Sequence, residues 1–233
     1  MSELLSCNQA EGITHIVMDD GKANVMSCKM LEALSGAISQ AETNGGVAVI
    51  QGRPGMFSGG FDLEVFRSGS KDEKVAMLKA GAELTEQLLA CPIPVIAACT
   101  GHAIAMGAFL LLSCDYRLAA DGKFKFAANE VAIGLTLPRF AITVCRQRLN
   151  PAALNRGLTL AYMFDPVAAQ QGGWLDEVVP AEKLESRAIE LATQCNKLHM
   201  ESHRATKLRL RADMLAQLRA DIEADCKDWS SRY

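Results

Sequence analysis

Short apolar runs alternate with longer amphipathic segments along this chain. Apolar runs of β-type composition at residues 15–18, 47–50 and 95–100 predict buried strands. Residues 71–90 place Val75, Leu78 and Leu88 on one side of a helix and most of their Lys and Glu neighbours elsewhere. A further helix is predicted after Ser27, which is a suitable N-cap, and it ends near Gly45. These elements predict an α/β protein.

The stretch 92–120 combines three predicted features in one place. An apolar strand at 95–100 leads through a turn of small residues at 101–107 into an apolar helix that ends at Ser113. The amide N–H groups at the start of such a helix have no intrahelical acceptor and attract negative charge. A core helix entered through a tight turn explains the stretch equally well.

A second glycine-rich turn precedes this stretch in the chain. Residues 53–66 read RPGMFSGGFDLEVF, in which Gly59 and Gly60 follow a strand and Asp62 caps a short helix. Two such turns, each after an apolar strand, predict a pair of backbone amide donors that converge on one oxygen atom.

Glu130 is the candidate acid–base residue. It follows a predicted strand at 123–127 and precedes an apolar loop. Burial there would raise its pKa and suit it to proton transfer. The alternative is an ordinary solvated carboxylate.

The last part of the chain is predicted to be largely helical. Residues 138–149, 151–160 and 166–171 have helical patterns, and 174–179 is an extended run. Two long helical patterns follow residue 181, and the second is rich in basic residues. This region is too polar to form a core of its own, so we expect it to pack on the main domain or on a neighbouring subunit. The predicted division is a core at 1–180 and a helical region at 181–233.

Composition and charge narrow the class of protein. The 233 residues are 49% apolar and 22% charged, which suits one compact α/β domain. The net charge of −3 argues against a general nucleic-acid or membrane surface. Four scattered histidines without an HExxH motif give little support to a metal site.

Cysteines and the N-terminal residues bear on the compartment. The eight cysteines have no regular spacing, and several lie in apolar runs, as expected of reduced thiols. The first twelve residues lack a signal-peptide pattern, and no apolar run approaches the length of a membrane span. We therefore expect a cytoplasmic protein.

Taken in order, these motifs resemble the crotonase superfamily, the enoyl-CoA hydratases and isomerases. The similarity runs from about residue 15 to residue 180 through the segments GKANVMS, MFSGGFDL, GHAIAMGAFLLLSCDYRLAA, NEVAIG and AAQQGGWLDEVVP. The resemblance implies a spiral of repeated ββα units with a C-terminal helical region that builds a homotrimer or a hexamer, a dimer of trimers. It also implies an acyl-CoA thioester as substrate, with no metal or redox cofactor.

The resemblance assigns site residues by position. The thioester oxygen would accept hydrogen bonds from the amides of Phe61 and Met106. The family usually has Gly where this chain has Met106, so the Met106 side chain must point away from the thioester or narrow the pocket. The other matching substrate-binding positions are Lys22, Ala23, Ser58, Gly59, Gly60, Gly107 and Phe109. Lys207, Arg209 and Arg211 are candidates for contact with the CoA phosphates, whereas His102 and Asp115 are predicted to be structural.

The acids distinguish the reactions within the family. Hydratases carry two glutamates, but here the first position holds Phe109 and only the second holds an acid, Glu130. One carboxylate suffices to move a proton between carbons, so the pattern is similar to the mitochondrial 3,2-enoyl-CoA isomerases of fatty acid metabolism. A hydratase that uses Glu64 as second acid and a non-catalytic acyl-CoA-binding protein are the alternatives.

Overall fold

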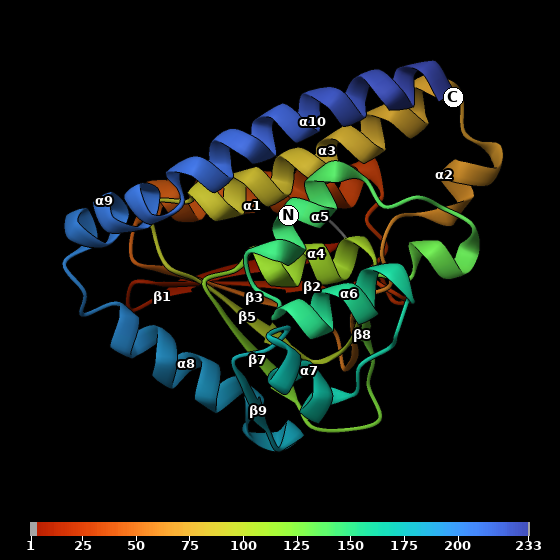
Figure 1. Ribbon diagram of the computed structural model, residues 1–233. Helices are drawn as coiled ribbons and strands as arrows, with labels where there is room; N and C mark the ends of the chain where they lie inside the picture. The colour runs from red at the N-terminus through yellow and green to blue at the C-terminus, as the bar shows by residue number, and fades with distance from the viewer. Residues whose placement is uncertain (1–3, 233) are drawn as a thin grey trace.

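The protein consists of two β-sheets, whose strands are mostly parallel, and a surrounding set of helices (Figure 1). The computed structural model describes residues 4–232. The larger sheet has the order β1-β2-β3-β5-β7-β9, in which only β1 is antiparallel to its neighbour. Its strands are β1 (Leu5–Ala10), β2 (Ile13–Met18), β3 (Val47–Gln51), β5 (Val95–Cys99), β7 (Tyr116–Ala120) and β9 (Glu177–Val179). The smaller sheet pairs β4 (Gly55–Ser58), β6 (Gly101–Ile104) and β8 (Phe126–Ala127) in parallel.

The predicted repeat of ββα units is confirmed. In each unit the first strand joins the larger sheet and the second joins the smaller one. The units are β3-β4 followed by α2 (Leu63–Ser68) and α3 (Lys71–Ala90), β5-β6 followed by α4 (Met106–Ser113), and β7-β8 followed by a 3₁₀ turn (Glu130–Ile133) and α5 (Arg139–Arg146). The second strand of each unit therefore brings its following turn to one common edge.

Helices cover both faces of the larger sheet. Because side chains alternate along a strand, Val49, Ile96 and Leu118 face α8 (Leu184–Cys195), whereas Ile50 and Ala97 join the main core on the other face. That main core also contains α1 (Cys28–Asn44), which Ser27 caps as predicted by accepting a bond from the Met30 amide. The smaller helices α6 (Pro151–Thr159) and α7 (Pro166–Gly172) complete the chain before β9.

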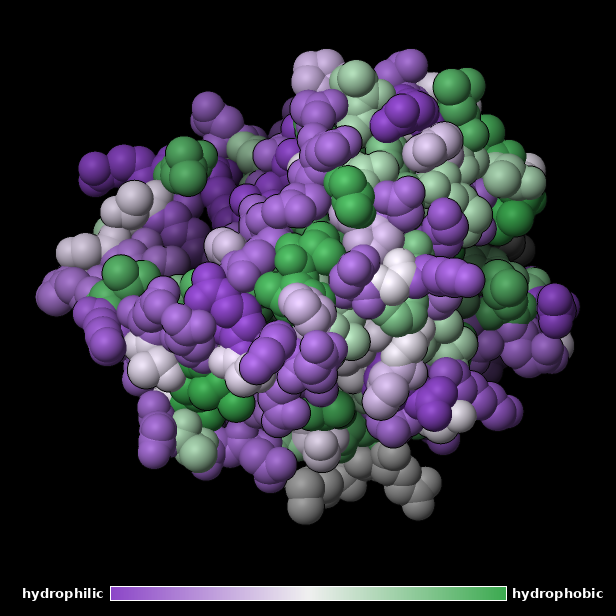
Figure 2. Space-filling view, turned by 90° about the horizontal axis from the view of Figure 1, so that it is seen from below, coloured by the Kyte–Doolittle hydropathy of each residue, from purple (hydrophilic) through white to green (hydrophobic). Residues whose placement is uncertain are grey.

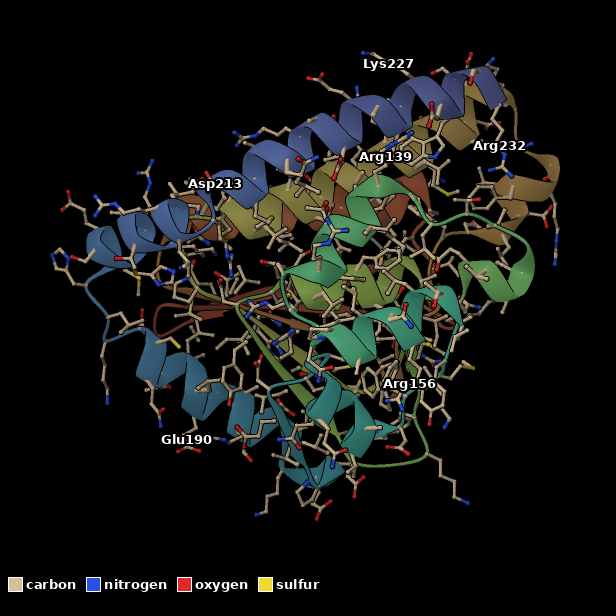
Figure 3. The ribbon with its side chains drawn as sticks, viewed as in Figure 1. Arg139, Arg156, Glu190, Asp213, Lys227 and Arg232 are labelled. Atoms are coloured by element: carbon tan, nitrogen blue, oxygen red, sulfur yellow. The ribbon has the colours of Figure 1, made fainter. Side chains whose placement is uncertain are left out.

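The C-terminal region contains three long helices rather than the two predicted. They are α8, α9 (Met200–Leu210) and α10 (Ala212–Arg232), preceded by a 3₁₀ turn at Ala181–Lys183. Helix α10 packs along α3 and α5 of the same chain (Figure 1). Its buried Asp225 accepts bonds from the Arg139 and Phe140 amides, at 3.1 and 3.0 Å, and so caps α5. Arg139 lies beneath α10 in Figure 3 and pairs with Asp225 and Asp228.

Several other boundaries differ from the sequence-based expectations. Residues 101–104 were expected in a turn, but they form β6, and the predicted strand 123–127 is reduced to Phe126–Ala127. Glu130 begins a 3₁₀ turn instead of lying in a loop. Strands β1 and β7 were not predicted. Residues 1–3 and 233 of the predicted domains lie outside the described part of the chain.

The surface and the cysteines fit a compact chain. No helix among residues 4–232 is long and apolar enough to cross a membrane. The face in Figure 2 is mostly hydrophilic, with separate apolar patches. All eight cysteines are free thiols, and burial raises the pKa of Cys99 and Cys114 to about 12, so these two are unreactive at neutral pH.

Candidate active site

A cavity of about 180 Å³ lies where the turns of the ββα units meet the end of α10. Its wall is mainly apolar and comes from five separate segments of the sequence. The lining residues are Gly59, Phe61, Leu63, Phe66, Leu78, Ile104, Ala105, Phe109, Asn129, Glu130, Ile133, Leu135, Thr136, Pro138, Trp229 and Arg232. Small, mostly apolar cavities with few polar groups are typical of ligand sites.

Glu130 is the only carboxylate that lines this cavity among residues 4–232. The residue is 8% exposed, and its Oε2 atom is buried without a hydrogen-bond partner in the described part of the chain. Burial raises the pKa of Glu130 to about 7, although a bond from its own backbone amide acts in the opposite direction. The group is therefore poised to exchange a proton near neutral pH, as the sequence predicted.

Replacing Glu130 by glutamine is expected to remove a pH-dependent loss of stability. Because the pKa of Glu130 in the folded protein lies above its ordinary value of 4.5, folding favours the protonated acid. The free energy of unfolding should fall as the pH rises from about 4.5 to 7, by on the order of 3 kcal/mol for full ionisation. Urea unfolding at pH 5 and pH 8 should show a smaller decrease in the Glu130→Gln variant. Equal decreases in both proteins would contradict a buried Glu130 that is protonated at pH 5.

The two turns that carry the Phe61 and Met106 amides touch each other at this edge of the sheets. A Cβ atom built on Gly60 would lie 3.5 Å from the Met106 amide nitrogen, so the turn after β4 touches the start of α4. Neither the Phe61 nor the Met106 amide donates a hydrogen bond to any group among residues 4–232. Paired free donors of this kind are the arrangement that stabilises an oxyanion.

The backbone at the start of α4 is strained. Ala105, which precedes Met106, has φ 50° and ψ −122°, a conformation that residues with a side chain rarely adopt. Such a residue costs on the order of 1–3 kcal/mol and is held in place by its surroundings. Met106 itself has no positive φ, and its buried side chain packs toward Gly81 on α3 instead of lining the cavity. The Met106 side chain therefore points away from the cavity, which is the first of the two orientations predicted from the sequence.

Ser58 and Gly107 hold the two turns together beneath the cavity. The fully buried Ser58 hydroxyl donates to the Asn24 carbonyl at 2.7 Å and accepts from the Gly60 amide at 3.2 Å. A Cβ on Gly107 would lie 2.5 Å from the Ser58 carbonyl oxygen, so α4 contacts β4 closely at this point. Neither Ser58 nor Gly107 lines the cavity. In the structure they support the two turns instead of making the predicted contact with the substrate.

Lys22 and Ala23 lie on the neighbouring loop. The Ala23 carbonyl accepts a 2.8 Å bond from the Gly59 amide, and the Lys22 carbonyl accepts one from Arg53. The Lys22 side chain is exposed beside the turn that contains Gly59, which itself lines the cavity. Their contact with substrate stays a prediction.

No second acidic side chain lines the cavity among residues 4–232. Phe109 occupies the predicted first acid position, lines the cavity and packs edge-on against Phe140 at 5.9 Å. Glu64 lies outside the cavity on the exposed side of α2, where its carboxylate accepts a bond from Ser68. The structure therefore does not bring Glu64 to Glu130.

Two of the three basic residues proposed for phosphate contact, Lys207 and Arg211, are paired with Asp115. Lys207 donates to Asp115 at 2.7 Å, and Arg211 pairs with the other oxygen of Asp115 at 2.9 Å. Lys207 is buried, so in this structure it holds Asp115 instead of facing a ligand, and Asp115 has the structural role that was predicted. Arg209 is exposed. His102 accepts a bond from the Lys125 amide and is structural as well.

Sequence reasoning missed the contribution of α10. Trp229 and Arg232 line the cavity although they lie about 100 residues after Glu130. Arg232 lies at the end of α10, on the side of α2 (Figure 3). The C-terminal region was expected to pack on the main domain or on a neighbouring subunit, but its sequence did not indicate which site it would cover.

Comparisons with known proteins give a consistent result. The family model described as enoyl-CoA hydratase/isomerase matches residues 8–232. The human mitochondrial enoyl-CoA delta isomerase 1 is 27% identical over 98% of this chain and 77% of its own length. A structure described as a Mycobacterium tuberculosis enoyl-CoA isomerase has a TM-score of 0.92 and 40% identity, with 100% of both chains covered. A second structure of the same Mycobacterium tuberculosis protein, there described as a probable enoyl-CoA hydratase, has a TM-score of 0.94 and 42% identity, covering 97% of this chain and 96% of the other.

Proposed function

The chain belongs to the enoyl-CoA hydratase/isomerase family, and from this premise we propose that it moves the double bond of a 3-enoyl-CoA thioester to the 2-position. The observation that supports this choice is a cavity with a single, desolvated carboxylate beside two unpaired backbone amides. An isomerase needs one group that removes a proton and returns it elsewhere, and Glu130 meets that requirement.

In the proposed reaction, ionised Glu130 removes a proton from C2 of the substrate. The electron pair of the C2–H bond moves between C1 and C2, and the carbonyl π pair moves onto the thioester oxygen, which gives a dienolate that keeps the C3–C4 double bond. Negative charge on this oxygen is stabilised by the amides of Phe61 and Met106, each contributing about 2.7–4 kcal/mol. Glu130 then returns the proton to C4: the oxygen pair forms the carbonyl bond again, the C1–C2 pair forms the C2–C3 double bond, and the former C3–C4 pair forms the new C4–H bond.

Hydration is the second candidate reaction. A Bacillus subtilis protein described as a probable enoyl-CoA hydratase supports it, with 33% identity over 73% of this chain and 66% of its own length. Adding water calls for one group that activates the water and another that handles the proton at C2. Glu64 lies away from the cavity and Phe109 cannot transfer a proton, so we favour isomerisation.

Product analysis separates the two reactions. The purified protein is incubated with 3-hexenoyl-CoA and, separately, with crotonyl-CoA, and the products are followed by mass and by chromatography. We expect the 2-enoyl isomer from the first substrate and no 3-hydroxybutanoyl-CoA from the second. Efficient hydration of crotonyl-CoA with no isomerisation would overturn the proposal.

The rate of isomerisation is expected to depend on the ionisation of Glu130. Because the base must be ionised and its pKa is about 7, kcat/KM should rise about tenfold per pH unit below pH 7 and reach a plateau above it. Initial rates between pH 5 and pH 9, at substrate concentrations below KM, measure this profile. A kcat/KM that decreases with rising pH would mean that the protonated form is the active one.

The remaining assignments complete the proposal. We propose a homotrimer or a hexamer, with coenzyme A entering only as part of the substrate and no metal or redox cofactor taking part. The cysteine pattern favours the cytoplasm, whereas the similar human isomerase is described as mitochondrial.

A further inference from the structure

Gly81 is a glycine in the middle of α3, a position where glycine ordinarily weakens a helix. Its missing side chain leaves room for two neighbours. A Cβ atom on Gly81 would lie 2.6 Å from two ring carbons of Phe61 and 3.2 Å from the Met106 sulfur. These are the two residues whose unpaired amides are the candidate oxyanion donors.

Besides contacting the Gly81 position, Phe61 lines the cavity. The ring lines the cavity together with Leu78, which precedes Gly81 by nearly one turn of α3, and it meets Phe66 edge-on at 6.3 Å. Met106 is fully buried, and α3 is fixed between α1 and α10. An added methyl group at position 81 would therefore displace the Phe61 ring toward the cavity.

We propose that Gly81 is a specificity-determining residue: by letting the Phe61 ring lie directly against α3, it sets how long an acyl chain the cavity accepts. This inference rests on the proposed function, because it assumes that the cavity holds the acyl part of a CoA thioester. The cavity of about 180 Å³ is slightly larger than the engineered cavity of about 150 Å³ that binds benzene. It therefore suits a short acyl chain, and a displaced ring would remove a large part of the space.

Binding of unreactive saturated thioesters tests the inference without relying on catalysis. Butanoyl-, hexanoyl- and octanoyl-CoA are titrated by calorimetry against the wild type, Gly81→Ala and Gly36→Ala. Gly36 is the matched control because it lies within α1, is exposed, and a Cβ atom there meets nothing within 4 Å. Each buried methylene contributes about fourfold to affinity, so the loss of room for one to two methylenes gives about a tenfold effect.

We expect Gly81→Ala to weaken hexanoyl- and octanoyl-CoA about tenfold and butanoyl-CoA at most about twofold, with Gly36→Ala unchanged. Adding Phe61→Leu to Gly81→Ala keeps the backbone amide, removes the ring, and should restore binding of the longer chains. An unchanged chain-length profile in Gly81→Ala, in a wild type that binds and isomerises its substrate, would overturn this inference alone. A wild type that binds none of the three thioesters would overturn the proposed function, and this inference with it.

Discussion

Turnover of a 3-enoyl-CoA by the Glu130→Gln variant is expected to fall at least about a thousandfold, while binding of the thioester stays within about twofold. General acid–base catalysis contributes factors of about 10²–10⁴, and the cavity offers no other carboxylate to replace the lost base among residues 4–232. Glutamine has nearly the same shape, so it fills the same buried position without an ionisable group. Single-turnover kinetics with calorimetric binding measure both quantities.

A Glu64→Gln variant is the matched control for this prediction. Glu64 is exposed on α2 and lies outside the cavity, so its rate should equal that of the wild type. A Glu130→Gln variant that retains more than a tenth of the wild-type rate would show that another group removes the proton.

The Gly107→Ala substitution is expected to reduce kcat/KM about 10²–10³-fold, because it separates the two amide donors. Its Cβ would lie 2.5 Å from the carbonyl oxygen and 2.6 Å from the Cβ of Ser58, two groups that belong to the turn leading to Phe61. Helix α4 begins at Met106, so moving it away from β4 moves the second donor away from the first. Overpacking of this kind also lowers the free energy of unfolding, by about 1–3 kcal/mol.

Steady-state kinetics and urea unfolding of the same preparations separate these two effects. Gly36→Ala serves as the control, since it introduces the same methyl group into a helix at an open position. If folded Gly107→Ala protein retains a wild-type kcat/KM, close contact between α4 and β4 is not needed to align the donors.

Local sequence signals identified most helices and the strands β2, β3, β5 and β9 of the larger sheet. Caps such as Ser27 and Asp62 are local in the chain, and the structure shows both side chains bonded to amides two or three residues further along. Of the smaller sheet only β8 was predicted, because the strands of this sheet are short and pair only with distant segments. Strand β6, for example, is four residues long and gains its partners from β4 and β8.

The candidate site was predictable to a similar extent. Phe61, Glu130 and Phe109 line one cavity, as the motifs indicated. The closure of that cavity by α10 and the role of Gly81 depend on packing between segments that are distant in the sequence, for which no motif exists. Lys207 was considered for phosphate contact because it lies in a run of basic residues. Such a run does not reveal that Lys207 is buried and paired with the Asp115 carboxylate.

We propose that Glu130 shifts the double bond of a 3-enoyl-CoA by proton transfer. Incubation of the wild type and Glu130→Gln with 3-hexenoyl-CoA in deuterated water, followed by NMR and mass spectrometry, tests it most directly. We expect the wild type to move the double bond to C2–C3 and to incorporate deuterium only at C2 or C4, without forming a 3-hydroxyacyl product. We expect the Glu130→Gln variant neither to move the double bond nor to incorporate deuterium. A wild type that binds the thioester but neither moves the bond nor exchanges hydrogen at C2, or a Glu130→Gln variant that matches the wild type, would contradict it.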